Sequence, residues 1–396
     1  MKFKLITIFI SVFVIFISCD KLLPPAPEES EILDGPMENL SYEQRLQFLR
    51  GDDAFNEVFT KESGLGPIFV ANSCASCHSG DGKGHPFTTL TRFGQDDTTG
   101  NKYLNQGGNQ LQHRALPGYK PETLPEGASH SDFIAPAVTG LGFLAYLTDE
   151  SIIEMSDPND ANGDGISGVV NWIEIPDYIN PSTSAISQNG KYIGRFGKKA
   201  SAYNLLHQTV GAYNQDMGIA SFFNPIDVYS NLEIEPEVSN QTIYDLDFYL
   251  HTLKAPIQRN QNNPEVIKGK VIFGQINCGS CHKETLRTGY SPIEALSNKE
   301  FHPYTDLLLH DMGSELDDNY TEGIALTSEW RTPALWGLGL SADSQGGQYY
   351  LMHDGRARSI EEAILLHGGE AERSKNLYLE LNKEDKNSLI KFLKSL

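Results

Sequence analysis

The hydrophobic and polar positions along the chain predict helices at matching places in its two halves. Residues 242–253 and 383–396 both carry apolar side chains at the spacing of one helix face. Shorter helices are expected to begin at 52–55 and at 268–273, each ahead of a pair of cysteines. The best strand signal, at 169–175, fits one arm of a small hairpin. The pattern therefore predicts a mainly α protein with long loops and at most a small β-hairpin.

Shifts in composition divide the chain into segments. A polar, proline-flanked stretch at 255–264 predicts a linker. It separates two related helical domains at 38–255 and 264–396, of which the first is longer by inserted loops. Ahead of both domains, residues 19–37 are rich in Pro and Glu and predict an extended tether.

The first 18 residues resemble a bacterial lipoprotein signal peptide. Lys2 and Lys4 precede an apolar stretch that is too short for a comfortable membrane span, and Ser18 and Cys19 follow it. Cleavage before Cys19 would leave a lipidated N-terminus that anchors the protein to a membrane. An uncleaved apolar anchor is the alternative. We therefore expect the protein in the cell envelope of a bacterium, with its body in the periplasm or at the cell surface.

The charge balance limits the partners of the chain. Its 396 residues include 52 Asp and Glu against 31 Lys and Arg, which gives a net charge of −21. An acidic surface repels phosphate backbones, so nucleic acid is not expected as a partner. A cationic protein partner stays compatible with this charge.

The cysteines indicate the chemistry. After Cys19, the four that remain form two Cys-x-x-Cys-His motifs, namely Cys74, Cys77 and His78, then Cys278, Cys281 and His282. This is the attachment signature of c-type haem, because two thiols on one helical turn can bond the porphyrin vinyl groups while the histidine binds the iron. A zinc site would need the pairs close together, and a redox dithiol would need no histidine. The motifs lie 204 residues apart, so we predict two covalently bound haem c groups.

Further segments make the chain resemble the bacterial di-haem oxidoreductases, which are similar to the di-haem cytochrome c peroxidases. The resemblance covers nearly all of 40–396, and its segments are 139–144, 160–168, 194–200, 216–219, 304–313, 330–337 and 353–364. It implies two cytochrome c-like helical domains. It also implies that the C-terminal haem takes electrons from a small donor protein, such as a cytochrome c or a cupredoxin, and that the N-terminal haem reduces peroxide. A non-catalytic di-haem electron-transfer cytochrome is the alternative.

The resemblance also assigns a sixth ligand to the C-terminal iron. In the peroxidases this ligand lies fourteen residues after the histidine of the His-Asp-Gly segment, a count that leads from His353 to His367. Histidine stands there in place of the usual Met or Tyr. Met312 and Met352 are rival ligands, and a helix-end histidine that bonds a carbonyl is the structural alternative.

For the N-terminal haem, the resemblance points to Gln208 and Asp216 as catalytic residues. The relatives often have Glu where this chain has Asp216, and a carboxyl group there can move a proton between the two peroxide oxygens. Lys198 stands where the family often has a tryptophan between the haems, and the nearest aromatic residue is Phe196. Candidates for a displaceable sixth ligand are His85, His113 and His130.

A calcium site is a further candidate. Asp160, Asn162 and Asp164 match the start of an EF-hand-like loop, in which oxygen ligands alternate along the chain. The twelfth position is Asn171 and not the glutamate of that motif. An Asp/Asn/Gly turn that binds no ion therefore stays as an equal alternative to calcium.

The two complete motifs predict the cofactor content. Purified protein should give two haems per chain by pyridine haemochrome assay, because each motif supplies both thiols and an iron ligand. Replacing Cys278 and Cys281 together by Ser should remove one haem and retain the other. A ratio near one haem per chain in the unaltered protein would contradict this prediction.

Overall fold

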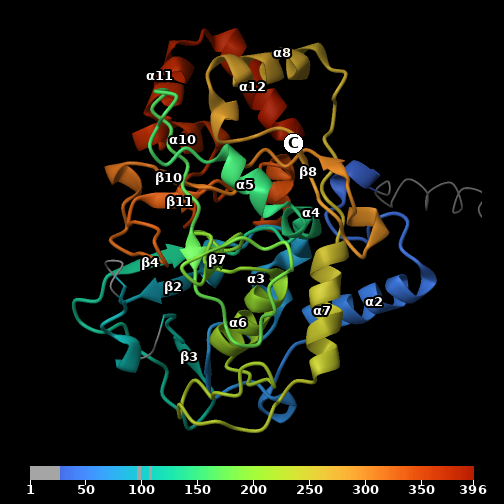
Figure 1. Cartoon of the computed structure of the whole chain (residues 1–396), viewed down its shortest axis with the longest axis vertical. Helices are drawn as coiled ribbons and strands as arrows, with labels where there is room; N and C mark the ends of the chain where they lie inside the picture. The colour runs from blue at the N-terminus through green and yellow to red at the C-terminus, as the bar shows by residue number, and fades with distance from the viewer. Residues whose placement is uncertain (1–26, 96–99, 107–108) are drawn as a thin grey trace, which may run out of the picture.

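The computed structural model describes residues 27–95, 100–106 and 109–396, and this part of the chain is mainly helical with small sheets (Figure 1). The predicted signal peptide, residues 1–18, and Cys19 lie outside the described residues. The α-helices are α2 (Tyr42–Asn56), α3 (Cys74–Cys77), α4 (Leu141–Ala145), α5 (Asp149–Met155), α6 (Leu205–Met217), α7 (Asn240–Thr252), α8 (Pro264–Gln275), α9 (Ser341–Ser344), α10 (Ile360–Leu365), α11 (Glu372–Glu380) and α12 (Lys383–Ser395). None of the described helices is long and apolar enough to cross a membrane.

Two helix pairs dominate the packing, one in each half of the chain. Helix α2 packs on α7, and α8 packs on α12 (Figure 1). Each pair approaches closely at a glycine. A Cβ atom on Gly51 would lie 2.2 Å from the carbonyl oxygen of Asp245 in α7, and one on Gly269 would lie 2.1 Å from that of Ser388 in α12. Both helix pairs therefore require glycine at the contact. In each pair the earlier helix precedes a cysteine motif.

The helix boundaries agree with the apolar pattern at α7 and α12, whereas the helices expected to begin at 52–55 and at 268–273 begin earlier, at Tyr42 and at Pro264. Helices α7 and α12 match the predicted 242–253 and 383–396 closely, and α8 begins at Pro264, where the predicted linker ends. The helix expected to begin near residue 52 instead begins at Tyr42. Ser41 caps it through a capping box with Gln44. The apolar spacing did not predict the first turns of this helix. Tyr42, Leu46 and Leu49 are exposed, so these apolar residues do not form a buried face.

The strands exceed the single small hairpin that was predicted. Among the described residues there are five small antiparallel sheets, with the strand orders β1-β3, β2-β4, β5-β7-β6, β8-β9 and β10-β11. Their strands are β1 (Ile68–Phe69), β2 (Leu90–Phe93), β3 (Arg114–Ala115), β4 (His130–Phe133), β5 (Trp172–Ile173), β6 (Ser187–Gln188), β7 (Lys191–Ile193), β8 (Leu286–Arg287), β9 (Glu300–Phe301), β10 (Leu309–Asp311) and β11 (Glu329–Arg331). Strands of two to four residues are too short for an alternating pattern to be recognised in the sequence.

The described end of the predicted tether lies against the body. Pro36 forms a bridge with Leu253, and the backbone N–H of Met37 donates to the carbonyl of Thr252 at 2.8 Å. Met37 is buried, and Arg259 donates to the carbonyl of Ser30. This end of the 19–37 segment therefore packs along α7 instead of extending away from it.

The apolar core links the two halves of the chain. One cluster gathers side chains of α2, α6 and α7 with Leu286, Phe301 and Trp336 from the second half. A second cluster is built around α8 and α12. The boundary at 255–264 stays a prediction, since the first cluster draws residues from both sides of it.

The glycine contact in α8 gives a stability prediction. Gly269→Ala should destabilise the protein by about 1–3 kcal/mol, because the added methyl group collides with the backbone of α12. Gly274→Ala in the same helix is the matched control, since nothing lies within 4 Å of its added Cβ. The control should be neutral or stabilising by about 0.5–1 kcal/mol. Urea unfolding of both variants checks this, and equal stability of the two would contradict the close approach.

Candidate functional site

Both cysteine motifs open into one cavity. Its volume is about 580 Å³, and its lining includes both cysteine pairs, His78 and His282. Helix α6 forms part of the wall, together with the segment from Trp330 to Leu338. Two motifs 204 residues apart in sequence therefore face a shared, mainly apolar space.

The first motif is held by a short capped helix. Ser73 caps α3 by accepting a hydrogen bond from the backbone N–H of Ser76, and the N–H of His78 donates to the carbonyl of Cys74 at 2.9 Å. The Nδ1 atom of His78 lies 2.7 Å from the carbonyl oxygen of Pro136. Because a carbonyl only accepts, Nδ1 carries the proton and Nε2 keeps the lone pair that a metal requires.

The second motif repeats this arrangement. Cys278–Ser280 forms a 3-10 turn, and the N–H of His282 donates to the carbonyl of Cys278 at 3.0 Å. The Nδ1 atom of His282 lies 2.9 Å from the carbonyl oxygen of Tyr304. Both histidines therefore present Nε2 as the free nitrogen, which is the orientation that an iron ligand of c-type haem needs.

The protonation states in the cavity fit haem attachment better than thiolate chemistry. Burial lowers the pKa of His78 and of His282 to about 4, so both rings are neutral and able to bind a metal. Burial raises the pKa of Cys74 to about 12 and that of Cys77 to about 11. A redox dithiol needs a lowered thiol pKa, and the four described cysteines form no disulfide. The residues present thus fit two porphyrins bound through thioethers.

His367 lies in the same cavity with the same orientation. Its Nδ1 atom is 2.7 Å from the carbonyl oxygen of Ala363, which leaves Nε2 free. Burial lowers the pKa of His367, which lines the cavity together with His282. Met312 and Met352 also line the cavity and stay rivals, and Met352 has a left-handed backbone with φ of 69°.

His353 has a different environment. Its Nε2 atom lies 2.6 Å from a carboxylate oxygen of Asp318, and its ring stacks on Trp330 with centroids 3.7 Å apart. One ring face and the Nε2 nitrogen of His353 are therefore committed to neighbours, whereas Nε2 of His367 is free. Packing and hydrogen bonding account for His353 without metal ligation.

Helix α6 carries the predicted pair Gln208 and Asp216, and both line the cavity. Gln208 is exposed. Asp216 is held by Gln110, whose Nε2 atom donates to its Oδ1 at 2.5 Å, and Arg92 in turn donates to the Gln110 side chain at 3.2 Å. Burial raises the pKa of Asp216 to about 6, against the opposing effects of Gln110 and Arg92. Sequence reasoning missed Gln110 because it lies in a loop without a recognisable motif.

The three histidines proposed as displaceable ligands do not line the described cavity wall. The ring of His85 meets that of Tyr350 edge to face, while His113 and His130 lie elsewhere. A histidine that the sequence did not single out, His207, does line it. Its Nδ1 atom accepts a hydrogen bond from the N–H of Tyr203 at 3.3 Å, so its Nε2 carries the proton and can donate into the cavity.

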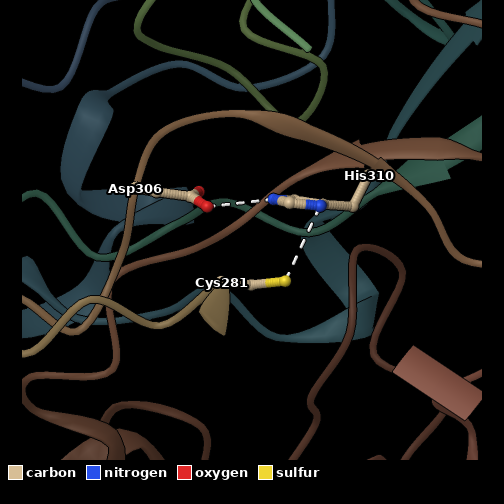
Figure 2. Close-up of side chains that lie close together, drawn as sticks. All are labelled: Cys281, Asp306 and His310. Atoms are coloured by element: carbon tan, nitrogen blue, oxygen red, sulfur yellow. Dashed lines mark hydrogen bonds and ion pairs between the residues drawn. The ribbon is translucent and has the colours of Figure 1, made fainter. Parts of the chain in front are cut away.

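Cys281 also belongs to a compact polar cluster (Figure 2). The ring of His310 lies between Asp306, at 3.0 Å from Nε2, and Glu370, at 2.6 Å from Nδ1, with the Cys281 sulfur at 3.6 Å. Burial by itself would lower the pKa of His310, but these partners raise it to about 12. Both nitrogens therefore carry protons and offer no lone pair to a metal, although among the described residues this trio has ligand atoms at metal-binding spacing.

The predicted calcium loop is satisfied by its own backbone. Asp160 accepts from the N–H of Gly165 at 3.2 Å, Asn162 from that of Asp164 at 2.8 Å, and Asp164 from that of Ile166 at 2.9 Å. These are Asx-type turns, in which the side-chain oxygens hold the loop itself. The structure thus gives the calcium prediction no support, and the turn without an ion accounts for the motif.

Comparison with known proteins identified a family and similar solved structures. A family model described as "Di-haem oxidoreductase, putative peroxidase" matches residues 131–396. Among solved structures, the chain is similar to hydrazine synthase from Kuenenia stuttgartiensis pressurised with xenon, at 15% identity and a TM-score of 0.40, over 94% of this chain and 96% of that chain. A search of curated proteins gave no match.

The orientation of His367 gives a spectroscopic prediction. His367→Ala should convert one of the two haems from low spin to high spin and raise its midpoint potential, because the C-terminal iron loses its sixth ligand. His207→Ala is the control, since that ring has no free nitrogen directed at a metal. Electron paramagnetic resonance and redox titration measure both. An unchanged low-spin signal would transfer the assignment to Met312 or Met352.

Proposed function

The chain belongs to the di-haem oxidoreductase family, and on that basis we propose that it is a peroxidase-type enzyme with two covalently bound haem c groups. Electrons enter at the C-terminal haem, and peroxide is reduced at the N-terminal haem. The observation that carries the proposal is the shared cavity, into which both Cys-x-x-Cys-His motifs open with neutral, suitably oriented histidines.

The helix pairs support two cytochrome c-like domains. Each haem motif follows a helix, α2 or α8, that crosses a later helix at a glycine. Because the crossing fixes the helix ahead of each motif, it also fixes the position of the thiols relative to the core. This arrangement lets each half carry its own porphyrin while both porphyrins face one cavity.

His78 and His282 would bind the two irons, and the four cysteines would hold the porphyrins through thioethers. His367 would complete the coordination of the C-terminal iron. The haem supplies the redox chemistry when bound. The open N-terminal site is then the place for peroxide, and α6 supplies the polar groups there.

Asp216 would manage the proton at the N-terminal site. Reduction of peroxide to two waters takes two electrons and two protons, so a group that accepts and returns a proton assists the cleavage. Gln110 and Arg92 hold the Asp216 carboxyl in place. Gln208 would position peroxide by hydrogen bonding and would not itself transfer a proton.

We infer the kind of electron donor from the net charge of the chain, and the location from its N-terminal motif. A net charge of −21 favours a donor with a cationic face, such as a small cytochrome c or a cupredoxin. We propose lipid anchoring through Cys19, which keeps the body in the bacterial cell envelope. The oxidising, secreted location also suits covalent haem attachment.

The role of Asp216 gives a kinetic prediction. Asp216→Asn should slow peroxide reduction by about 10²–10⁴-fold, equal to roughly 3–5 kcal/mol, because the amide cannot carry the proton. Gln208→Ala should cost less, and Glu235→Gln on the surface should have no effect. Stopped-flow mixing of half-reduced protein with peroxide measures the rates. Equal rates in the Asp216 variant would overturn its assignment, while an inactive two-haem wild type would indicate an electron-transfer cytochrome.

The raised pKa of Asp216 predicts the pH dependence. Below a pKa of about 6 the carboxyl group is protonated and cannot accept the peroxide proton, so the rate should fall as pH drops through this value. Above it the rate should reach a plateau. The acidic limb should vanish in Asp216→Asn. A limb retained in that variant would assign it to another group.

A further inference from the structure

Three cationic side chains share the wall of the cavity. Lys83 follows the first haem motif, Lys198 lies in the loop after β7, and Arg331 ends β11. The backbone N–H of Arg331 donates to the carbonyl of Lys198 at 3.0 Å, so these two are neighbours. The charges of Lys83 and Arg331 both lower the pKa of Lys198, so Lys198 lies within the electrostatic reach of two other positive groups.

These cations lack a counterion among the described residues. Neither the ammonium group of Lys83 nor that of Lys198 makes a hydrogen bond or ion pair with a described side chain or backbone group. Arg331 donates only to the carbonyl oxygens of Gly197 and Thr332, at 2.8 and 3.2 Å.

The carboxylates whose charges act on Lys198 and Arg331, Asp354 and Asp306, are already engaged. Asp354 pairs with Arg356 at 2.7 Å, and Asp306 pairs with His310 at 3.0 Å.

The adjacent Lys199 shows how this chain satisfies a lysine with a structural role. Its ammonium donates to the carbonyls of Leu326, Thr327 and Glu329 and lies over the ring of Trp330. Lys198 has none of these partners, although it is the next residue. The difference indicates that Lys198 is placed to bind a ligand in the cavity and does not share the structural role of Lys199.

Unpaired cations beside an apolar cavity require an anion. Burial lowers the pKa of Lys198 to about 7 and that of Lys83 to about 8, because no partner compensates for the loss of water around these charges. Lysine and arginine bind carboxylates through charge-assisted hydrogen bonds. A porphyrin attached to cysteines through its vinyl groups carries two propionate carboxylates on another edge, away from the thioethers. The cofactor therefore brings the anions that the wall lacks.

We propose that Lys83, Lys198 and Arg331 form a binding site for haem propionate carboxylates between the two haem positions. Lys83 and Lys198 bind those of the N-terminal haem, since Lys83 follows His78 closely in sequence and the charge of Lys198 acts on His78. Arg331 binds a propionate from the side of the second half of the chain. The proposal rests on the proposed function only in requiring c-type haem in the cavity.

The experiment uses the two-haem protein. Lys198→Met and Lys83→Met should each shift the propionate bending bands in resonance Raman spectra and lower the midpoint potential of the N-terminal haem, because a nearby positive charge favours the reduced iron. Lys198→Arg should keep both readouts near wild type. Lys120→Met, at an exposed lysine, is the matched control and should change neither. Haem content is measured in every variant.

The outcomes separate this proposal from its alternatives. Unchanged bands and potentials in Lys83→Met and Lys198→Met with two haems would overturn it. If Lys198→Met does not fold, Lys83→Met and Lys83→Gln decide by the same readouts. A saturable effect of inorganic phosphate on the wild-type potential, lost in Lys83→Met, would assign the cations to a free anion and overturn it as well. Wild type with two haems but no peroxidase activity would end only the proposed function.

Discussion

The structure depends on one constraint: each Cys-x-x-Cys-His motif must direct two sulfurs and one imidazole nitrogen into the same space. The chain meets it by tying Nδ1 of His78 and of His282 to backbone carbonyls from distant loops, at Pro136 and Tyr304. These bonds choose the tautomer and fix the ring. The helix pairs behind the motifs, which meet at Gly51 and Gly269, make the placement rigid.

The charge of the whole chain differs in sign from the unpaired charges on the wall of the cavity. The chain as a whole carries a net charge of −21, whereas its cavity wall holds unpaired cations at Lys83 and Lys198. On the proposed function, an acidic exterior suits a cationic donor, and a cationic wall suits the carboxylates of a porphyrin. Carboxylates also lie on that wall, and one of them, Asp216, is held there by Gln110.

A buried polar network connects the second haem motif to distant loops. Glu370 accepts from the backbone and hydroxyl of Ser167 as well as from His310, which approaches Cys281. Glu370 lies three residues after His367 in sequence, so the network also fixes the loop that carries this proposed ligand. The loop at 160–168 therefore supports the C-terminal site through Ser167.

The sequence by itself determined the two haem attachment sites, the helices at α7, α8 and α12, and the family, because thiol spacing and apolar periodicity are local properties. Only the tertiary structure decided which other groups meet those motifs. Gln110 reaches the cavity from a loop, His207 from the first turn of α6 and His310 from β10, and the short strands pair across long separations. Contacts of this kind depend on how distant segments fold together, and no local spacing records that.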